Sequence, residues 1–182
     1  AANEGNDQEC FVTSDSTSLL TRKRCTRQYS VQKRAFADQL IQLLLPNYNI
    51  VLYTNMEKAF ADKIIDKLFP NVFCKRFYRG HTRQKDLLDI QVDLTKAVFV
   101  DAKPRATKQW QNQICISKFK KACDDVELCA LASFLISKNA CPPMPTYVQN
   151  WSQFRKEYMT QCHKSMHDSH GIYPQVIQGI EA

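Results

Sequence analysis

The chain has 182 residues, 44% of them hydrophobic and 24% charged, a balance typical of a globular protein with one substantial core. Its most apolar runs, at residues 40–45 and 97–100, are far shorter than the roughly 20 residues of a membrane helix, so no membrane span is expected. The formal net charge of +7 favours acidic surfaces or nucleic acid as partners.

Residues 1–9 are small and polar, and we predict that they form a flexible lead-in to the fold. Five short runs rich in branched and aromatic residues follow, without the alternation of a half-exposed strand. Such runs are typical of strands that are covered on both faces. The predicted strands are residues 10–12, 50–53, 72–74, 97–100 and 114–116.

Helical patterns separate most of these strands. One apolar face covers residues 36–44 and ends at Pro46, and a second covers residues 60–68 and ends at Pro70. A third helix over residues 128–135 has Asp124 or Asp125 as its expected cap. The alternation predicts an α/β fold: a three-layer, Rossmann-like parallel sheet of about five strands with helices on both faces.

The domain is expected to span residues 10–140, and a C-terminal extension follows over residues 141–182. Trp151, Phe154, Tyr158 and Cys162 lie on one face of a predicted helix in this extension. Such a face is more often packed in a core than used to stack bases, so we expect it to dock on the domain or on a partner. Neither Trp110 nor Trp151 requires a ligand to explain it.

Eight cysteines are present, without a C-x-x-C pair or a regular spacing, so we expect reduced thiols, several of them small core residues. His163 and His167 are one helical turn apart, but no second cysteine pair or acidic ligand accompanies them. We therefore expect a helix end on the surface there, and no metal site.

Four segments occur in one order at plausible spacing: YNIVLYTNMEKAFADKIIDKLFPN (48–71), RFYRGHT (76–82), KDLLDIQVDL (85–94) and AVFVDAKP (97–104). Together they resemble the carboxy-terminal-domain phosphatase and NLI-interacting-factor group of the haloacid dehalogenase superfamily. Within that group they are most similar to its divergent relative, the presequence-translocase receptor of the mitochondrial inner membrane. The likeness covers residues 29–137.

The resemblance implies roles for three residues. In the family a strand ends in Ser or Thr, a Lys precedes Asp-Leu, and a later strand delivers an Asp that binds Mg²⁺. The matching residues here are Thr54, Lys85 and Asp101. Thr54 would hydrogen-bond a phosphoryl oxygen, Lys85 would neutralise phosphate charge, and Asp101 would ligate the metal.

The first motif of the family departs from its pattern in this chain. The family's D-x-D-x-T supplies a nucleophilic and an acidic aspartate, whereas CFVTSDSTSLL (10–20) aligns Thr13 with the nucleophile and Asp15 with the acid. A phosphothreonine ester is as inert as the substrate, so turnover is not expected. The aspartate missing at position 13 would also have ligated Mg²⁺, and Lys103 adds positive charge near Asp101, so no metal or other cofactor is expected.

Two interpretations of the remaining motif residues stay open. In the first they form a working site; in the second they form a retained network in which Lys85 pairs with Asp15 and Asp101 while Thr54 bonds the backbone. A related alternative is a Mg²⁺-dependent protein serine/threonine phosphatase with Asp15 as nucleophile, which leaves Thr17 where the second aspartate belongs.

Cations follow several of the predicted strands and would gather at the carboxyl edge of the sheet. They suggest that binding of a polyanion, either RNA or an acidic protein, replaced phosphoryl transfer. We therefore predict a catalytically inactive subunit of a larger mitochondrial assembly, a ribonucleoprotein or a protein translocase, located in the matrix. The cations are Arg22, Lys23, Arg24, Arg27, Arg76, Arg79, Lys103, Arg105 and Lys108.

Overall fold

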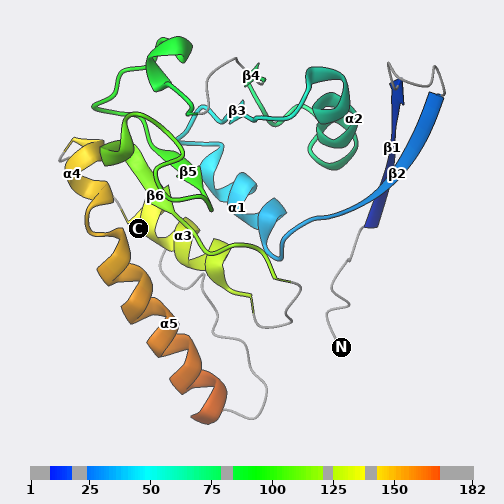
Figure 1. Ribbon diagram of the computed structural model, residues 1–182. Helices are drawn as coiled ribbons and strands as arrows, with labels where there is room; N and C mark the ends of the chain where they lie inside the picture. The colour runs from blue at the N-terminus through cyan, green and yellow to red at the C-terminus, as the bar shows by residue number, and fades with distance from the viewer. Residues whose placement is uncertain (1–8, 18–23, 79–83, 121–124, 138–142, 169–182) are drawn as a thin grey trace. The chain divides into compact units, whose positions relative to one another are not determined.

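The computed structural model describes residues 9–17, 24–78, 84–120, 125–137 and 143–168 (Figure 1). The chain divides into two compact units. Unit 1 comprises Ala1–Arg34 and Tyr48–Thr82, and unit 2 comprises Ala35–Asn47 and Arg83–Ala182. Residues 35–47 therefore belong with the C-terminal half of the chain. No helix among the described residues is long and apolar enough to cross a membrane.

Unit 1 combines a hairpin, a helix and a pair of parallel strands. Strands β1 (Glu9–Thr17) and β2 (Arg24–Gln32) pair antiparallel along their whole length. Strands β3 (Val51–Tyr53) and β4 (Lys75–Phe77) pair in parallel, and α2 (Lys58–Leu68) connects them. The core of the unit forms around Leu68, against which Val31, Phe60, Ile64 and Phe69 pack.

Unit 2 is built around α3 (Glu127–Ile136), whose side chains are buried on nearly every side. Helix α1 (Ala37–Leu44) packs on α3, and β5 (Phe99–Asp101) pairs in parallel with β6 (Gln113–Cys115). Two short 3₁₀ helices, η1 (Leu87–Ile90) and η2 (Trp110–Asn112), interrupt the intervening chain. Helices α4 (Met144–Val148) and α5 (Trp151–Asp168) complete the unit.

The mixed α/β class is as predicted, whereas the single five-stranded sheet is not found among the described residues. The strands instead form three two-stranded pairs: β1 with β2, β3 with β4, and β5 with β6. The main error concerns residues 24–32. The apolar residues of this segment all fall on odd-numbered positions, with polar residues between them, which is the pattern of a half-buried antiparallel strand. They are Cys25, Tyr29 and Val31.

Most predicted elements elsewhere agree with the structure apart from their ends. Helices α1, α2 and α3 lie where the apolar periodicity placed them. The N-cap of α3 is Val126 rather than the predicted aspartate, although Asp125 accepts a hydrogen bond from the backbone N–H of Glu127 at 3.2 Å. The predicted strand over residues 72–74 is wrong, because β4 covers Lys75–Phe77 and shares no residue with it. The short helices η1, η2 and α4 were not predicted, since each has only three to five residues and no full apolar period.

Candidate functional site

Asp101 and Lys85 of unit 2 form a close ion pair. Asp101 ends β5, and the Nζ atom of Lys85 lies 2.8 Å from its Oδ2 atom, with 11% of the Lys85 side chain and 22% of the Asp101 side chain exposed. The other carboxylate oxygen, Oδ1, accepts the backbone N–H of Lys103 at 2.8 Å. Each oxygen of Asp101 therefore already accepts a hydrogen bond from the chain itself.

Lys85 is held in place from three sides. Its backbone bridges to Thr107, with Lys85 N–H donating to Ala106 O at 3.0 Å and Lys108 N–H donating to Lys85 O at 2.9 Å. Its Nζ atom also lies over the ring of Phe99, 4.9 Å from the centroid. A partly buried cation with a carboxylate and an aromatic face around it is well compensated electrostatically.

Thr54 of unit 1 directly follows β3. Its backbone N–H donates to Phe77 O at 2.9 Å, and its Oγ1 atom accepts the N–H of Met56 at 3.1 Å. The hydroxyl thus stabilises the turn that leads into α2. The retained-network interpretation of the motif residues expects such a bond from Thr54 to the backbone.

Thr13 and Asp15 lie within β1, opposite Gln28 and Thr26 of β2. The sequence prediction placed them at the carboxyl end of a strand in a parallel sheet, and the structure places them inside an antiparallel hairpin instead. Strand β1 continues for two residues beyond Asp15 and pairs throughout. The described residues therefore do not form the strand end from which the family presents its nucleophile.

The predicted cations differ in their surroundings. Lys103 and Arg105 are exposed, and Lys108 pairs with Asp86 at 2.9 Å. Arg24 and Arg27 belong to β2, and Arg22, Lys23 and Arg79 lie outside the described residues. Arg76 already contacts two carboxylates of α2, Asp62 at 3.0 Å and Asp66 at 2.7 Å.

The Arg76 contacts belong to a network on the surface of unit 1. Asp62 also accepts hydrogen bonds from Lys58 at 2.6 Å and from the hydroxyl of Tyr78. The hydrogen bonds from Lys58 and Tyr78 lower the pKa of the Asp62 carboxyl to about 2. This network orders α2 against the end of β4, and its charges largely cancel.

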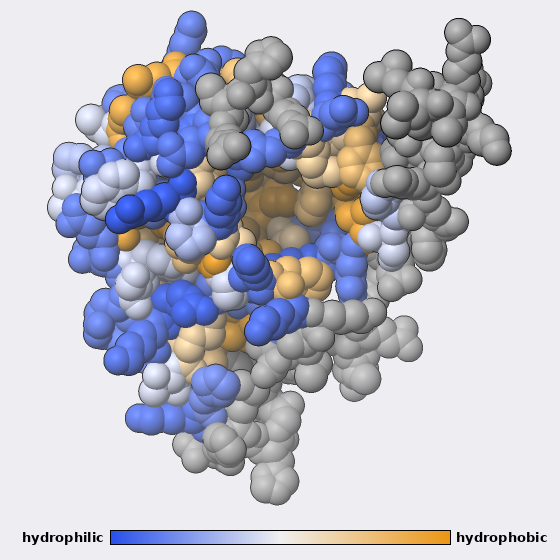
Figure 2. Space-filling view, in the orientation of Figure 1, coloured by the Kyte–Doolittle hydropathy of each residue, from blue (hydrophilic) through white to orange (hydrophobic). Residues whose placement is uncertain are grey.

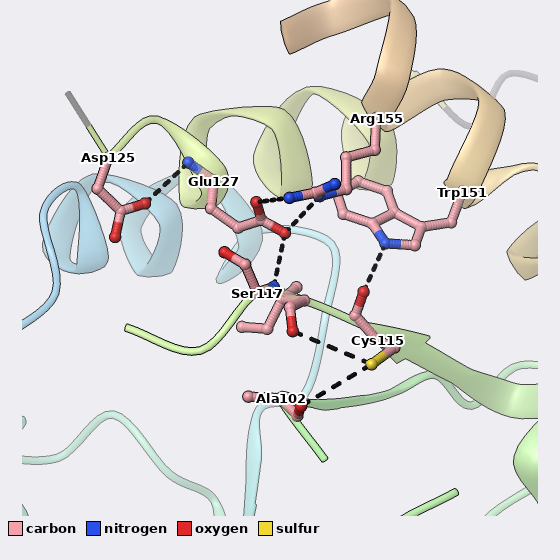
Figure 3. Close-up of polar contacts among 8 residues, drawn as sticks. Ala102, Cys115, Ser117, Asp125, Glu127, Trp151 and Arg155 are labelled. Carbon is pink, nitrogen blue, oxygen red and sulfur yellow. Dashed lines mark hydrogen bonds and ion pairs between the residues drawn. The ribbon is translucent and has the colours of Figure 1, made fainter. Parts of the chain in front are cut away.

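Figure 3 shows the polar contacts by which the C-terminal helix docks on unit 2. Glu127 at the start of α3 is 2% exposed, and both of its oxygens accept from the guanidinium of Arg155 on α5. Trp151 is buried and donates its indole N–H to Cys115 O at 2.9 Å. The apolar face predicted for this helix therefore packs on the domain. The aromatic pattern indicated that face, but Glu127 gave no signal in the sequence.

The described residues contain no group of three or more His, Cys, Asp or Glu side chains that could hold a metal ion. The resemblance assigns a Mg²⁺ ligand to the position of Asp101. The ammonium of Lys85 contacts this carboxylate. A Mg²⁺ ion at this carboxylate would share it with the ammonium of Lys85 and would need further oxygen ligands.

The residues that the resemblance assigns to the family's motifs are Thr54, directly after β3, and the pair of Lys85 with Asp101. Residues 5–143 of the chain match the family model of the NLI interacting factor-like phosphatases. The chain belongs to this family. No curated protein matches it. The match ends before α4 and α5, so the two helices that cover α3 and β6 lie beyond the family domain.

Proposed function

We propose that this NLI-interacting-factor-like domain is catalytically silent and serves as a binding subunit of a larger assembly. The feature that supports this most directly is Thr13, which the resemblance aligns with the nucleophile position and which lies within the paired β1–β2 ladder. Hydrolysis of phosphate monoesters is among the slowest uncatalysed reactions, so a site without its nucleophile gives negligible turnover.

The partner of such a subunit is anionic. Lys103 and Arg105 follow β5 on the surface of unit 2, and the formal net charge of the chain is +7. Cations of this kind supply affinity for phosphate or carboxylate groups without any chemistry. The similarity to the mitochondrial branch of the family suggests an assembly in the mitochondrial matrix, a ribonucleoprotein or a protein translocase. No cofactor is needed for this role.

An assay of the full chain with Mg²⁺ and either an aryl phosphate or a phosphopeptide tests the proposal. We expect no turnover above background, and Asp15→Asn should leave the result unchanged. Turnover that Asp15→Asn abolishes would refute the silent-subunit proposal.

The second candidate function is a Mg²⁺-dependent protein serine/threonine phosphatase with Asp15 as nucleophile. The pair of Lys85 with Asp101 favours it, because both residues stand at the family positions and lie within hydrogen-bonding distance. This candidate also predicts that Lys85→Met and Asp101→Asn each remove turnover. The same assay decides between the two functions.

A further inference from the structure

The segment of residues 103–110, here called the display loop, presents charged and aromatic side chains from a fixed backbone. Ala106 and Thr107 are buried, at 8% and 1% exposed, and anchor its centre. Around them Lys103, Arg105, Lys108 and Trp110 are exposed. The loop therefore combines a buried anchor with an outward-facing set of three cations and one indole.

Hydrogen bonds from neighbouring segments of unit 2 hold the display loop. The side-chain amide of Gln113 accepts from Ala106 N–H at 2.9 Å and donates to Lys103 O at 2.7 Å. Gln84 donates to Arg105 O at 3.2 Å. Arg105 has φ of 50°, a left-handed conformation that costs energy in a residue with a Cβ and is retained by these bonds. A loop fixed in this way loses little entropy on binding.

Two cations of the loop are available to a ligand. Among the residues that the structure describes, neither Lys103 nor Arg105 makes an ion pair or side-chain hydrogen bond, whereas Lys108 pairs with Asp86. Their charges are therefore not balanced within the described part of unit 2, and both side chains face solvent.

Trp110 is 57% exposed, in contrast to Trp151, which is 3% exposed in the core of unit 2. Leu88 of η1 is 59% exposed, and Gln109, next to Trp110, ties the two segments together through bonds to Leu87 N–H and to Asp86. Figure 2 shows apolar side chains over the segment of η1, at the upper left, among hydrophilic ones. More than half of the Trp110 side chain is therefore accessible to a ligand.

A second basic and aromatic stretch leaves the same edge of the β5–β6 pair. Ile116 N–H donates to Asp101 O at 3.2 Å, so the chain after β6 runs beside the start of the loop after β5. Phe119, 40% exposed, lies there between the exposed Lys118 and Lys120. This stretch adds two exposed cations and an exposed ring to unit 2.

We propose that the display loop binds single-stranded RNA, with Lys103 and Arg105 on phosphates and Trp110 stacked on an unpaired base. Alternating cations beside an exposed aromatic ring are the arrangement that single-strand binders use, because every base offers a flat face and every linkage a charge. An acidic protein would use the cations and would bury Trp110 together with the exposed Leu88, whereas an RNA strand needs only the flat face of the indole. The inference rests on the proposed function as a silent binding subunit and names the chemistry of its partner.

The test is a titration of the full chain into labelled single-stranded oligouridine, followed by fluorescence anisotropy at several salt concentrations. Trp110→Ala should weaken binding about 5- to 150-fold, the loss expected for one stacked base. Arg105→Ala should weaken it and lower the slope of log affinity against log salt by about one. Lys156→Ala on α5, which removes an exposed cation from another surface, is the matched control and should change neither.

The Leu88→Ala variant, duplex RNA and polyglutamate distinguish an RNA partner from a protein partner. The proposal predicts that Leu88→Ala binds like the wild type, and that duplex RNA binds more weakly and independently of Trp110. Binding of oligouridine that is unaffected by Trp110→Ala overturns the proposal. The proposal is also overturned if polyglutamate displaces oligouridine completely and the Leu88→Ala and Trp110→Ala variants lose affinity equally. Neither result bears on turnover, so the phosphatase assay still decides the proposed function separately.

Discussion

Glu127 of α3 and Arg155 of α5 are joined by two hydrogen bonds, Nε to Oε1 and Nη2 to Oε2, both of 2.7 Å. Glu127 Oε1 also accepts the backbone N–H of Ser117 at 2.9 Å. The pair thus connects the end of the family domain, the chain after β6 and the C-terminal extension. A planar guanidinium that meets a carboxylate through two bonds fixes orientation as well as distance.

Glu127→Gln should destabilise the protein. The variant keeps an acceptor for Ser117 but loses the charge that compensates Arg155, at a cost of about 2–3 kcal/mol, reduced because the Arg155 side chain is 36% exposed. Urea unfolding measures the change. Glu157→Gln, on the exposed side of α5, is the control and should stay within about 0.5 kcal/mol of the wild type. Equal stability of the two variants would contradict the importance of the pair.

The same pair should make stability depend on pH in the acid range. Burial raises the pKa of Glu127, but hydrogen bonds from Arg155 and Ser117 outweigh it and place the pKa below the ordinary value of 4.5. A carboxyl with a lowered folded-state pKa stabilises fully above its unfolded pKa and loses that contribution as pH falls through the folded value. The difference in unfolding free energy between wild type and Glu127→Gln should be constant above about pH 5 and shrink below pH 4.5. If this difference grew as the pH fell, the pKa of Glu127 in the folded state would be raised rather than lowered.

The sequence predicted the longer helices because each has a complete apolar period and a proline or an aspartate at one end. It also predicted the strand that Asp101 ends, whereas the roles of Lys85 and Asp101 stay predictions. The β1–β2 hairpin was missed because strand pairing depends on partners distant in the chain, and a half-polar strand resembles a connecting loop. Gln113 and Gln84 were missed because a glutamine that bonds a loop backbone has no sequence signature.

Lys85→Met tests whether the motif lysine stabilises the fold. The change leaves Asp101 partly buried without its cation, so we expect a loss of about 2–3 kcal/mol in urea unfolding. Lys96→Met is the matched control, since the Lys96 side chain is 84% exposed and its contact to Asp93 is 3.9 Å. A stable Lys85→Met protein would indicate that the pair is kept for a reason other than stability.

Arg76→Ala separates structural cations from binding ones. Because Arg76 contacts Asp62 and Asp66, its removal should lower the urea midpoint while the affinity for oligouridine stays at the wild-type value. Lys75→Ala, an exposed neighbour on β4, should affect neither measurement. A fall in affinity for Arg76→Ala at unchanged stability would instead make Arg76 part of the anion-binding surface.

Gln113→Ala should weaken RNA binding although Gln113 need not touch the ligand. The change removes the two bonds by which Gln113 holds Lys103 and Ala106, so part of the display loop must be ordered at the moment of binding. We expect affinity for oligouridine to fall about 3- to 10-fold. Gln111→Ala, an exposed residue of η2 next to the loop, is the matched control. The slope of affinity against salt should match that of the wild type, because no phosphate contact is lost. A reduced slope would show that the loop had moved its cations away from the strand, and an unchanged affinity would show that its order does not contribute to binding.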